Sequence, residues 1–130
     1  MKVLALDYGS ARTGVAVSDP TGTLARPLGV VEQVGTEAGM AQLLELIRAE
    51  NPERIVVGLP LTIRGERGEQ ARETEQFVET LRGSTAIPVE SFDERFTTDL
   101  AEQTRSAAPE DARAAAHLLS GYLTWSSGRT

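Results

Sequence analysis

The chain has 130 residues, of which 40% are hydrophobic; it carries a net charge of −6 and contains no cysteine. This length fits one domain of ordinary size, and the lack of cysteine excludes disulfides, zinc–thiolate sites and thiol nucleophiles. The negative charge argues against broad, sequence-independent binding to nucleic acid, which normally relies on a basic face. No segment approaches the roughly 20 apolar residues of a membrane span, and the N-terminus leads directly into a strand, so a cytoplasmic domain without a membrane partner is expected.

The first part of the chain predicts a meander of three antiparallel strands followed by a helix. The strands are expected at residues 2–7, 14–18 and 24–32. Gly9 and Gly14 lie in the first turn, where they are expected to adopt backbone angles that other residues avoid. Apolar residues then recur at helical spacing over residues 37–50, and Asn51-Pro52 ends this helix.

The remainder of the chain predicts strands that alternate with helices. A short apolar strand is expected at 54–58, a helix at 66–82, a strand at 87–92, a helix from Thr97 or Thr98 to 105 and a last helix at 109–123. The order β-β-β-α-β-α-β-α-α implies an α/β fold with one mixed five-stranded sheet and helices on its faces. No linker or repeat interrupts it, so residues 1–125 are expected to form a single domain and residues 126–130 a frayed tail.

Carboxylates mark the ends of two predicted strands. Asp7 closes the first strand, and Asp93 and Glu94 follow the fifth. Because ligands collect at the carboxyl ends of parallel strands, these groups meet at one edge of the sheet if the first strand runs parallel to the later ones. The alternative for Asp7 is that it opens a turn and hydrogen-bonds its own backbone.

A third acidic point, Asp111, lies in the first turn of the last helix. At about 100° per residue it begins a stripe that continues through Ala114, Ala115, Leu118 and Tyr122, so it is expected on the face that packs against the sheet. A charge there is unusual unless it is paired or binds metal, although a carboxylate in a first helical turn can also simply complement the helix dipole.

Together the three acidic points suggest a site for divalent metal ions. Mg²⁺ prefers oxygen ligands, and two such ions about 4 Å apart can activate a water and stabilise the leaving oxygen of a phosphodiester. The sequence offers few other catalytic groups. Its single histidine, His117, lies off the Asp111 stripe as a surface or boundary residue, and no serine has a paired histidine and aspartate at recognisable spacing.

Four motifs in this order resemble the YqgF family, also called RuvX, which is described as a family of Holliday-junction resolvases in the ribonuclease H-like superfamily. They are Leu6-Asp7-Tyr8-Gly9-Ser10 with Arg12, Gly14 and Val15; Val57-Gly58-Leu59-Pro60-Leu61 with Gly65; Asp93-Glu94-Arg95 with Thr97-Thr98; and Asp111 with Ala114-Ala115, Leu118-Leu119 and Tyr122-Leu123. The resemblance covers nearly the whole chain. It implies a ribonuclease H-like fold and a Mg²⁺- or Mn²⁺-dependent nuclease that acts on a DNA junction, on single-stranded DNA or on RNA, including precursor 16S ribosomal RNA.

By position in these motifs, the resemblance assigns Asp7, Glu94 and Asp111 as catalytic, metal-binding carboxylates. Asp93 is the other candidate ligand, because strand alternation sends Asp93 and Glu94 to opposite faces and the sequence does not say which reaches the metal. Arg12 and Arg95 are candidates for binding substrate phosphate; the alternative for both is a salt bridge to a nearby carboxylate.

One departure from the family concerns the connection before Asp111. Members typically carry a longer segment with several bases, whereas Phe96 to Glu110 contains Arg105 as its single base. This shortness and the negative charge favour a smaller or single-stranded substrate over tight binding of a four-way junction. A symmetric homodimer would suit paired cuts in a junction, but no hydrophobic stripe in the sequence identifies an interface.

Two other classes of function fit parts of the sequence. Asp7-Tyr8-Gly9-Ser10 with the following Thr13 and Gly14 also resembles the first phosphate loop of actin-like ATPases, which need a second domain to close over the nucleotide. A non-catalytic module that keeps the fold and binds nucleic acid is the other alternative. The clustered carboxylates count against it, because unused like charges only repel one another.

Overall fold

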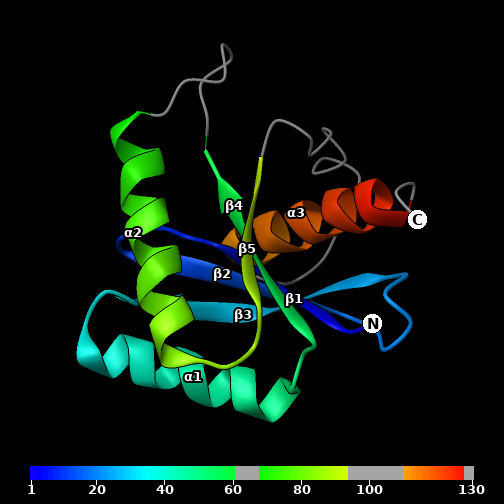
Figure 1. The fold of residues 1–130 in the computed structure, drawn as a ribbon, viewed down its shortest axis with the longest axis horizontal. Coiled ribbons are helices and arrows are strands. Elements are labelled where there is room, and N and C mark those ends of the chain that lie inside the picture. The colour runs from blue at the N-terminus through cyan, green and yellow to red at the C-terminus, as the bar shows by residue number, and fades with distance from the viewer. Residues whose placement is uncertain (61–67, 94–109, 128–130) are drawn as a thin grey trace.

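Five strands form one mixed sheet in the computed structural model, which describes residues 1–60, 68–93 and 110–127 (Figure 1). The strands are β1 (Val3–Asp7), β2 (Arg12–Ser18), β3 (Ala25–Glu32), β4 (Arg54–Leu59) and β5 (Val89–Asp93), in the spatial order β3-β2-β1-β4-β5. The central strand β1 is antiparallel to β2 and parallel to β4, and β4 is parallel to β5. The predicted mixed sheet and its meander are confirmed, and β1, β4 and β5 end at the same edge.

Among the described residues, three helices cover the two faces of this sheet: α1 (Glu37–Glu50), α2 (Glu69–Ser84) and α3 (Glu110–Ser127). Alternation along β1 shows the division, because Leu4 and Leu6 pack with residues of α1 and α2, whereas Val3 and Ala5 pack with residues of α3. The molecule therefore has a core on each side of the sheet, with α3 on the face opposite α1 and α2 (Figure 1).

Capping residues at both ends explain where α1 begins and ends. Thr36 accepts a hydrogen bond from the backbone N–H of Gly39 at 3.1 Å and so caps the start of α1. At the other end, Asn51 adopts the left-handed conformation with φ 48° and its N–H donates to the carbonyl of Ile47. Both bounds of α1 agree with the prediction.

Other element bounds differ from the prediction where tertiary contacts extend an element. Strand β2 begins at Arg12 instead of residue 14, because Arg12 and Thr13 pair with the end of β3. Strand β5 is Val89–Asp93 instead of 87–92, in parallel register with β4. Helix α3 continues to Ser127, so it includes two residues that were assigned to the tail.

Helix α2 begins after Gly68 and ends at Ser84, two residues beyond the expected end. The predicted start of this helix at residue 66 lies outside the described residues. The helix predicted between Thr97 or Thr98 and residue 105 also lies outside them.

Close packing, and not an unusual backbone angle, explains the glycines of the first turn. Among the described glycines only Gly22 has a positive φ, of 74°, so the expectation for Gly9 and Gly14 was wrong. A Cβ at Gly14 would lie 1.9 Å from the carbonyl oxygen of Asp111, and one at Gly9 would lie 2.4 Å from that of Arg12. The missing side chain of Gly14 therefore lets the first turn of α3 rest directly on β2.

Candidate metal centre

The structure brings Asp7 and Asp111 to the same place. Asp7, the last residue of β1, stands opposite Gly14 in the antiparallel register with β2. The backbone of Asp111 lies against Gly14 from the α3 side of the sheet. Because Val3 and Ala5 face α3, alternation directs Asp7 to that same face. Two of the three predicted carboxylates thus share one face at one end of the sheet.

Asp111 lies at the margin of the helix face that packs on the sheet, because this face is shifted by about one residue from the predicted stripe. The buried residues of α3 are Ala112, Ala115, Ala116, Leu118, Leu119, Tyr122 and Leu123. Ala114, which the prediction placed on the packing face, is only half-buried. The side chain of Asp111 is 37% exposed, so its carboxylate can be reached from solvent.

Arg12 forms an ion pair with Asp111, with Nε 3.3 Å from Oδ2. Of the two roles considered for Arg12, phosphate binding and a salt bridge, the structure shows the salt bridge. The arginine side chain is 65% exposed, and ion pairs at such sites typically contribute 0 to about 1 kcal/mol. Because this ion pair is weak, Arg12 can leave Asp111 and bind another anion at a small cost in free energy.

The end of β5 places one of the two acidic residues that the sequence could not distinguish, Asp93. Phe92 packs in the core on the α3 side and Val89 in the core on the α1 and α2 side. Alternation consequently places Asp93, which pairs with Leu59 of β4, on the side away from Asp7 and Asp111. Glu94 and Arg95 lie outside the described residues.

The donor set at this end of the sheet fits a hard divalent cation. Carboxylate oxygens from two separate elements are the ligands that Mg²⁺ and Mn²⁺ prefer. Within residues 1–60, 68–93 and 110–127, no group of three acidic, histidine or cysteine residues could hold a metal ion. At this end of the sheet, the described part of the chain therefore provides two carboxylates, Asp7 and Asp111.

His117 takes no part in this centre. The residue is half-buried on α3, as expected of a boundary position. In the part of the chain that the structure describes, its Nε2 is buried without a hydrogen-bond partner, as is Nε of Arg113.

A polar network missed by the sequence reasoning fixes the other end of α3. The Tyr122 hydroxyl donates to Oε1 of Glu90 on β5 and accepts from Nη1 of Arg54 on β4 at 2.8 Å. Arg54 also contacts Glu90 at 3.4 Å. Burial raises the pKa of the Tyr122 hydroxyl, and its hydrogen bond to Glu90 raises the pKa further. The network ties α3 to two parallel strands and so helps to orient the helix that carries Asp111.

Comparison with known proteins identifies the family. The family model for RuvX, described as Holliday junction resolvase, matches residues 1–124. The chain belongs to the RuvX family. Among its relatives, the "Putative pre-16S rRNA nuclease" of Chloroflexus aurantiacus is 42% identical over 130 residues, which cover 93% of this chain and 85% of the relative. The protein of the same name from Anaeromyxobacter sp. is 42% identical over 132 residues, covering 95% and 96%.

Solved structures support the ribonuclease H-like fold expected for a RuvX protein. Thermus thermophilus RuvC in complex with a Holliday junction substrate aligns with a TM-score of 0.69 at 18% identity, covering 100% of this chain and 98% of RuvC. The fowlpox virus Holliday junction resolvase aligns with a TM-score of 0.58 at 12% identity, covering 96% and 99%. At these identities the likeness shows the fold, which is that of the RuvC-like resolvases.

Proposed function

We propose that this RuvX-family chain is a nuclease that hydrolyses phosphodiester bonds with Mg²⁺ or Mn²⁺ bound by Asp7, Asp111 and Glu94. The observation that carries the proposal is the convergence of Asp7 and Asp111 at Gly14, on the α3 face of the sheet. When bound, the metal supplies an activated water and positive charge beside the leaving oxygen. Glu94 is preferred to Asp93 as the third ligand because alternation along β5 turns Asp93 to the other face.

Arg12 is proposed to bind the substrate phosphate. Its side chain is mostly exposed and forms an ion pair with Asp111. An arginine can present two N–H donors to a phosphate at once, and contact with phosphate would release the carboxylate for the metal. Arg95 is proposed for the same role from its place in the Asp93-Glu94-Arg95 motif.

Single-stranded precursor 16S ribosomal RNA is the substrate that we propose first. Relatives that align over almost their whole length are named for this RNA. The net charge of −6 also favours a substrate that needs few phosphate contacts. A four-way DNA junction is the second candidate, since the family model describes a Holliday junction resolvase. That substrate needs two cuts, so it requires the homodimer that remains a prediction.

Cleavage assays on three labelled substrates test the proposal: single-stranded RNA with the precursor 16S sequence, single-stranded DNA, and a four-way junction. Each is incubated with Mg²⁺, with Mn²⁺ and with a chelator. We expect cleavage only with metal, and a loss of at least about 100-fold in Asp7→Asn, because a metal ligand contributes several kcal/mol to transition-state stabilisation. Circular dichroism verifies that the variant is folded.

Two neighbouring variants provide the matched comparison. Glu94→Gln is expected to lose activity as Asp7→Asn does, whereas Asp93→Asn is expected to keep most of it. The reverse pattern would assign the metal to Asp93. Substrate binding without cleavage in either metal would favour the non-catalytic module, and ATP-dependent thermal stabilisation would favour the nucleotide-binding alternative.

A further inference from the structure

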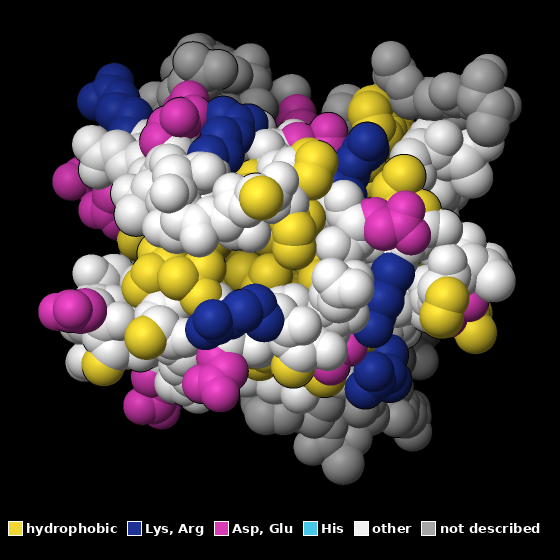
Figure 2. All heavy atoms as spheres, turned by 60° about the horizontal axis from the view of Figure 1, so that its bottom comes forward, with side chains coloured by type: hydrophobic (Ala, Val, Ile, Leu, Met, Phe, Trp, Pro, Cys, Tyr) yellow, Lys and Arg dark blue, Asp and Glu magenta, His cyan; other side chains and the backbone are white. Residues whose placement is uncertain are grey.

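A groove of about 320 Å³ lies on the face of the sheet opposite the candidate metal centre. It is bounded by α1, α2 and the ends of β1 and β3, and its lining includes Tyr8, Val34, Met40, Glu73 and Phe77. Figure 2 shows hydrophobic side chains gathered in a hollow on this side of the molecule, with both basic and acidic side chains around it. Its volume is at the lower end of the range for small-ligand pockets, so it fits one long side chain better than a folded element.

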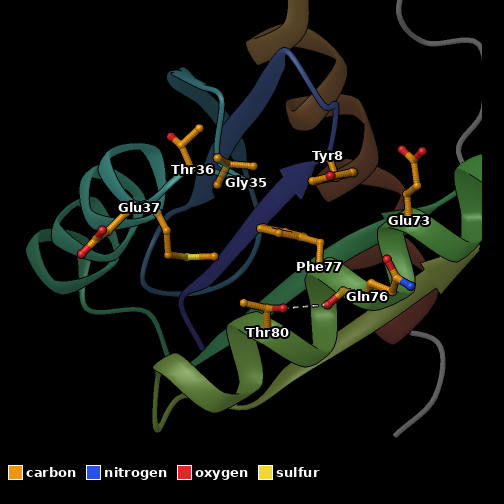
Figure 3. A pocket seen from close by; sticks show the side chains of 10 residues that line it. Tyr8, Gly35, Thr36, Glu37, Glu73, Gln76, Phe77 and Thr80 are labelled. Atoms are coloured by element: carbon orange, nitrogen blue, oxygen red, sulfur yellow. Dashed lines mark hydrogen bonds between the residues drawn. The ribbon is translucent and has the colours of Figure 1, made fainter.

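The floor of the groove is apolar and aromatic. Tyr8 stacks on Phe77, with ring centroids 4.6 Å apart and an interplanar angle of 25° (Figure 3). Phe77 and Val34 are buried, while Tyr8 and Met40 are only half-buried and present part of their surface to the groove. An occupant with an alkyl stem and a flat polar end would cover this surface well.

The electrostatics of the groove favour a cation. Of the described residues that line it, Glu37 and Glu73 are acidic and none is basic. Glu73 lines the same groove as Tyr8 and Phe77 (Figure 3). The same charges repel phosphate, so a nucleic acid is disfavoured.

We propose that this groove binds an arginine side chain of a basic partner protein. The alkyl stem packs along the half-buried Met40, the planar guanidinium stacks on Tyr8, and Glu73 accepts hydrogen bonds from its N–H groups. Arginine fits better than lysine because its guanidinium is flat and weakly hydrated, so it can stack on the Tyr8 ring and form an ion pair with Glu73 at the same time. The net charge of −6 attracts a basic partner at longer range. The proposal is independent of the proposed nuclease activity.

Nuclear magnetic resonance titration of the ¹⁵N-labelled chain tests this site with a defined probe, the peptide acetyl-Leu-Arg-Leu-amide. We expect chemical shift changes confined to the groove, above all at Tyr8, Phe77 and Thr80. A peptide with citrulline in place of arginine has nearly the same shape but no charge, and it should bind clearly more weakly.

Two variants with equal loss of charge locate the interaction. Glu73→Gln should weaken binding about threefold, as expected for removal of an exposed ion pair. Glu45→Gln, at an exposed position of α1 outside the groove, should leave the affinity unchanged. No shifts in the groove, equal binding of the citrulline peptide, or equal affinities of the two variants would refute the proposal. Shifts at the same amides with oligouridylate in place of the peptide would show a nucleic-acid site instead.

Discussion

Replacement of Gly14 by alanine tests whether the contact between β2 and α3 builds the metal centre. The added Cβ would lie 1.9 Å from the carbonyl oxygen and 2.4 Å from the carbonyl carbon of Asp111. Real Cβ contacts are essentially never shorter than 3.0 Å, so the first turn of α3 has to move by about 1 Å. The obstructing atoms are backbone atoms, and rotation of a side chain cannot relieve the overlap.

This displacement should affect both stability and activity. Overpacking of this kind costs about 1–3 kcal/mol in the free energy of unfolding. For a domain of this size the melting temperature should fall by roughly 4 °C for each kcal/mol. Since Asp111 moves with the helix, cleavage should fall by about 100-fold, the usual effect of a 1 Å misplacement of a catalytic group.

Gly29→Ala provides the matched control. Gly29 lies on β3 of the same sheet, and a Cβ there would meet no atom within 4 Å. We expect this variant to melt within about 1 °C of wild type and to cleave at the wild-type rate. Differential scanning calorimetry and the RNA cleavage assay measure the two effects. A Gly14→Ala variant that melts and cleaves like Gly29→Ala would show that α3 does not depend on Gly14 for its position.

Two further predictions concern side chains that contact α3 or belong to it. Tyr122→Phe loses the hydrogen bonds to Glu90 and Arg54 and should be destabilised by about 1 kcal/mol in urea denaturation at pH 7. Because the pKa of Tyr122 is raised in the folded state, its contribution is present below the unfolded pKa near 10 and is lost as pH rises above it. The difference in the free energy of unfolding between wild type and variant should therefore become smaller in alkaline solution. A difference that does not change with pH would contradict this prediction. Arg12→Gln should weaken RNA binding several-fold while Mn²⁺ binding to the free protein, measured by calorimetry, stays equal or becomes tighter, because Asp111 loses a competing cation. Weaker Mn²⁺ binding would contradict the exchange of Arg12 between carboxylate and phosphate.

The mixed sheet and the order of its strands along the chain could be predicted because the relevant signals are local. The apolar run of β1 ends at Asp7, and helical periodicity between Thr36 and Asn51 gives both ends of α1. For these features, residues close in sequence hold enough information. Parallel alignment of β1 with the later strands is only a condition in the prediction, and the structure fulfils it, so that Asp7 ends at the same edge as β4 and β5.

The features that were missed depend on contacts between distant segments. The clash that requires glycine at position 14 comes from the backbone of Asp111, which is far away in the sequence. Helical periodicity could not fix the rotation of α3 to within one residue, because its alanine-rich surface offers several similar apolar stripes. The salt bridge of Arg12 likewise depends on where α3 begins relative to β2. Tertiary packing determines these three features, and the spacing of residues in a single sequence does not indicate them.

The electrostatics of the centre link the acidic composition to the proposed chemistry. Asp7 and Asp111 present negative charge to a negatively charged substrate, and Arg12 neutralises part of it in the free protein. A divalent ion reverses the sign of the local charge, after which Arg12 is better used on phosphate than on carboxylate. In the proposed mechanism, attraction of nucleic acid would reside in the metal and a few arginines instead of a broad basic face. This arrangement reconciles a net charge of −6 with a nuclease fold.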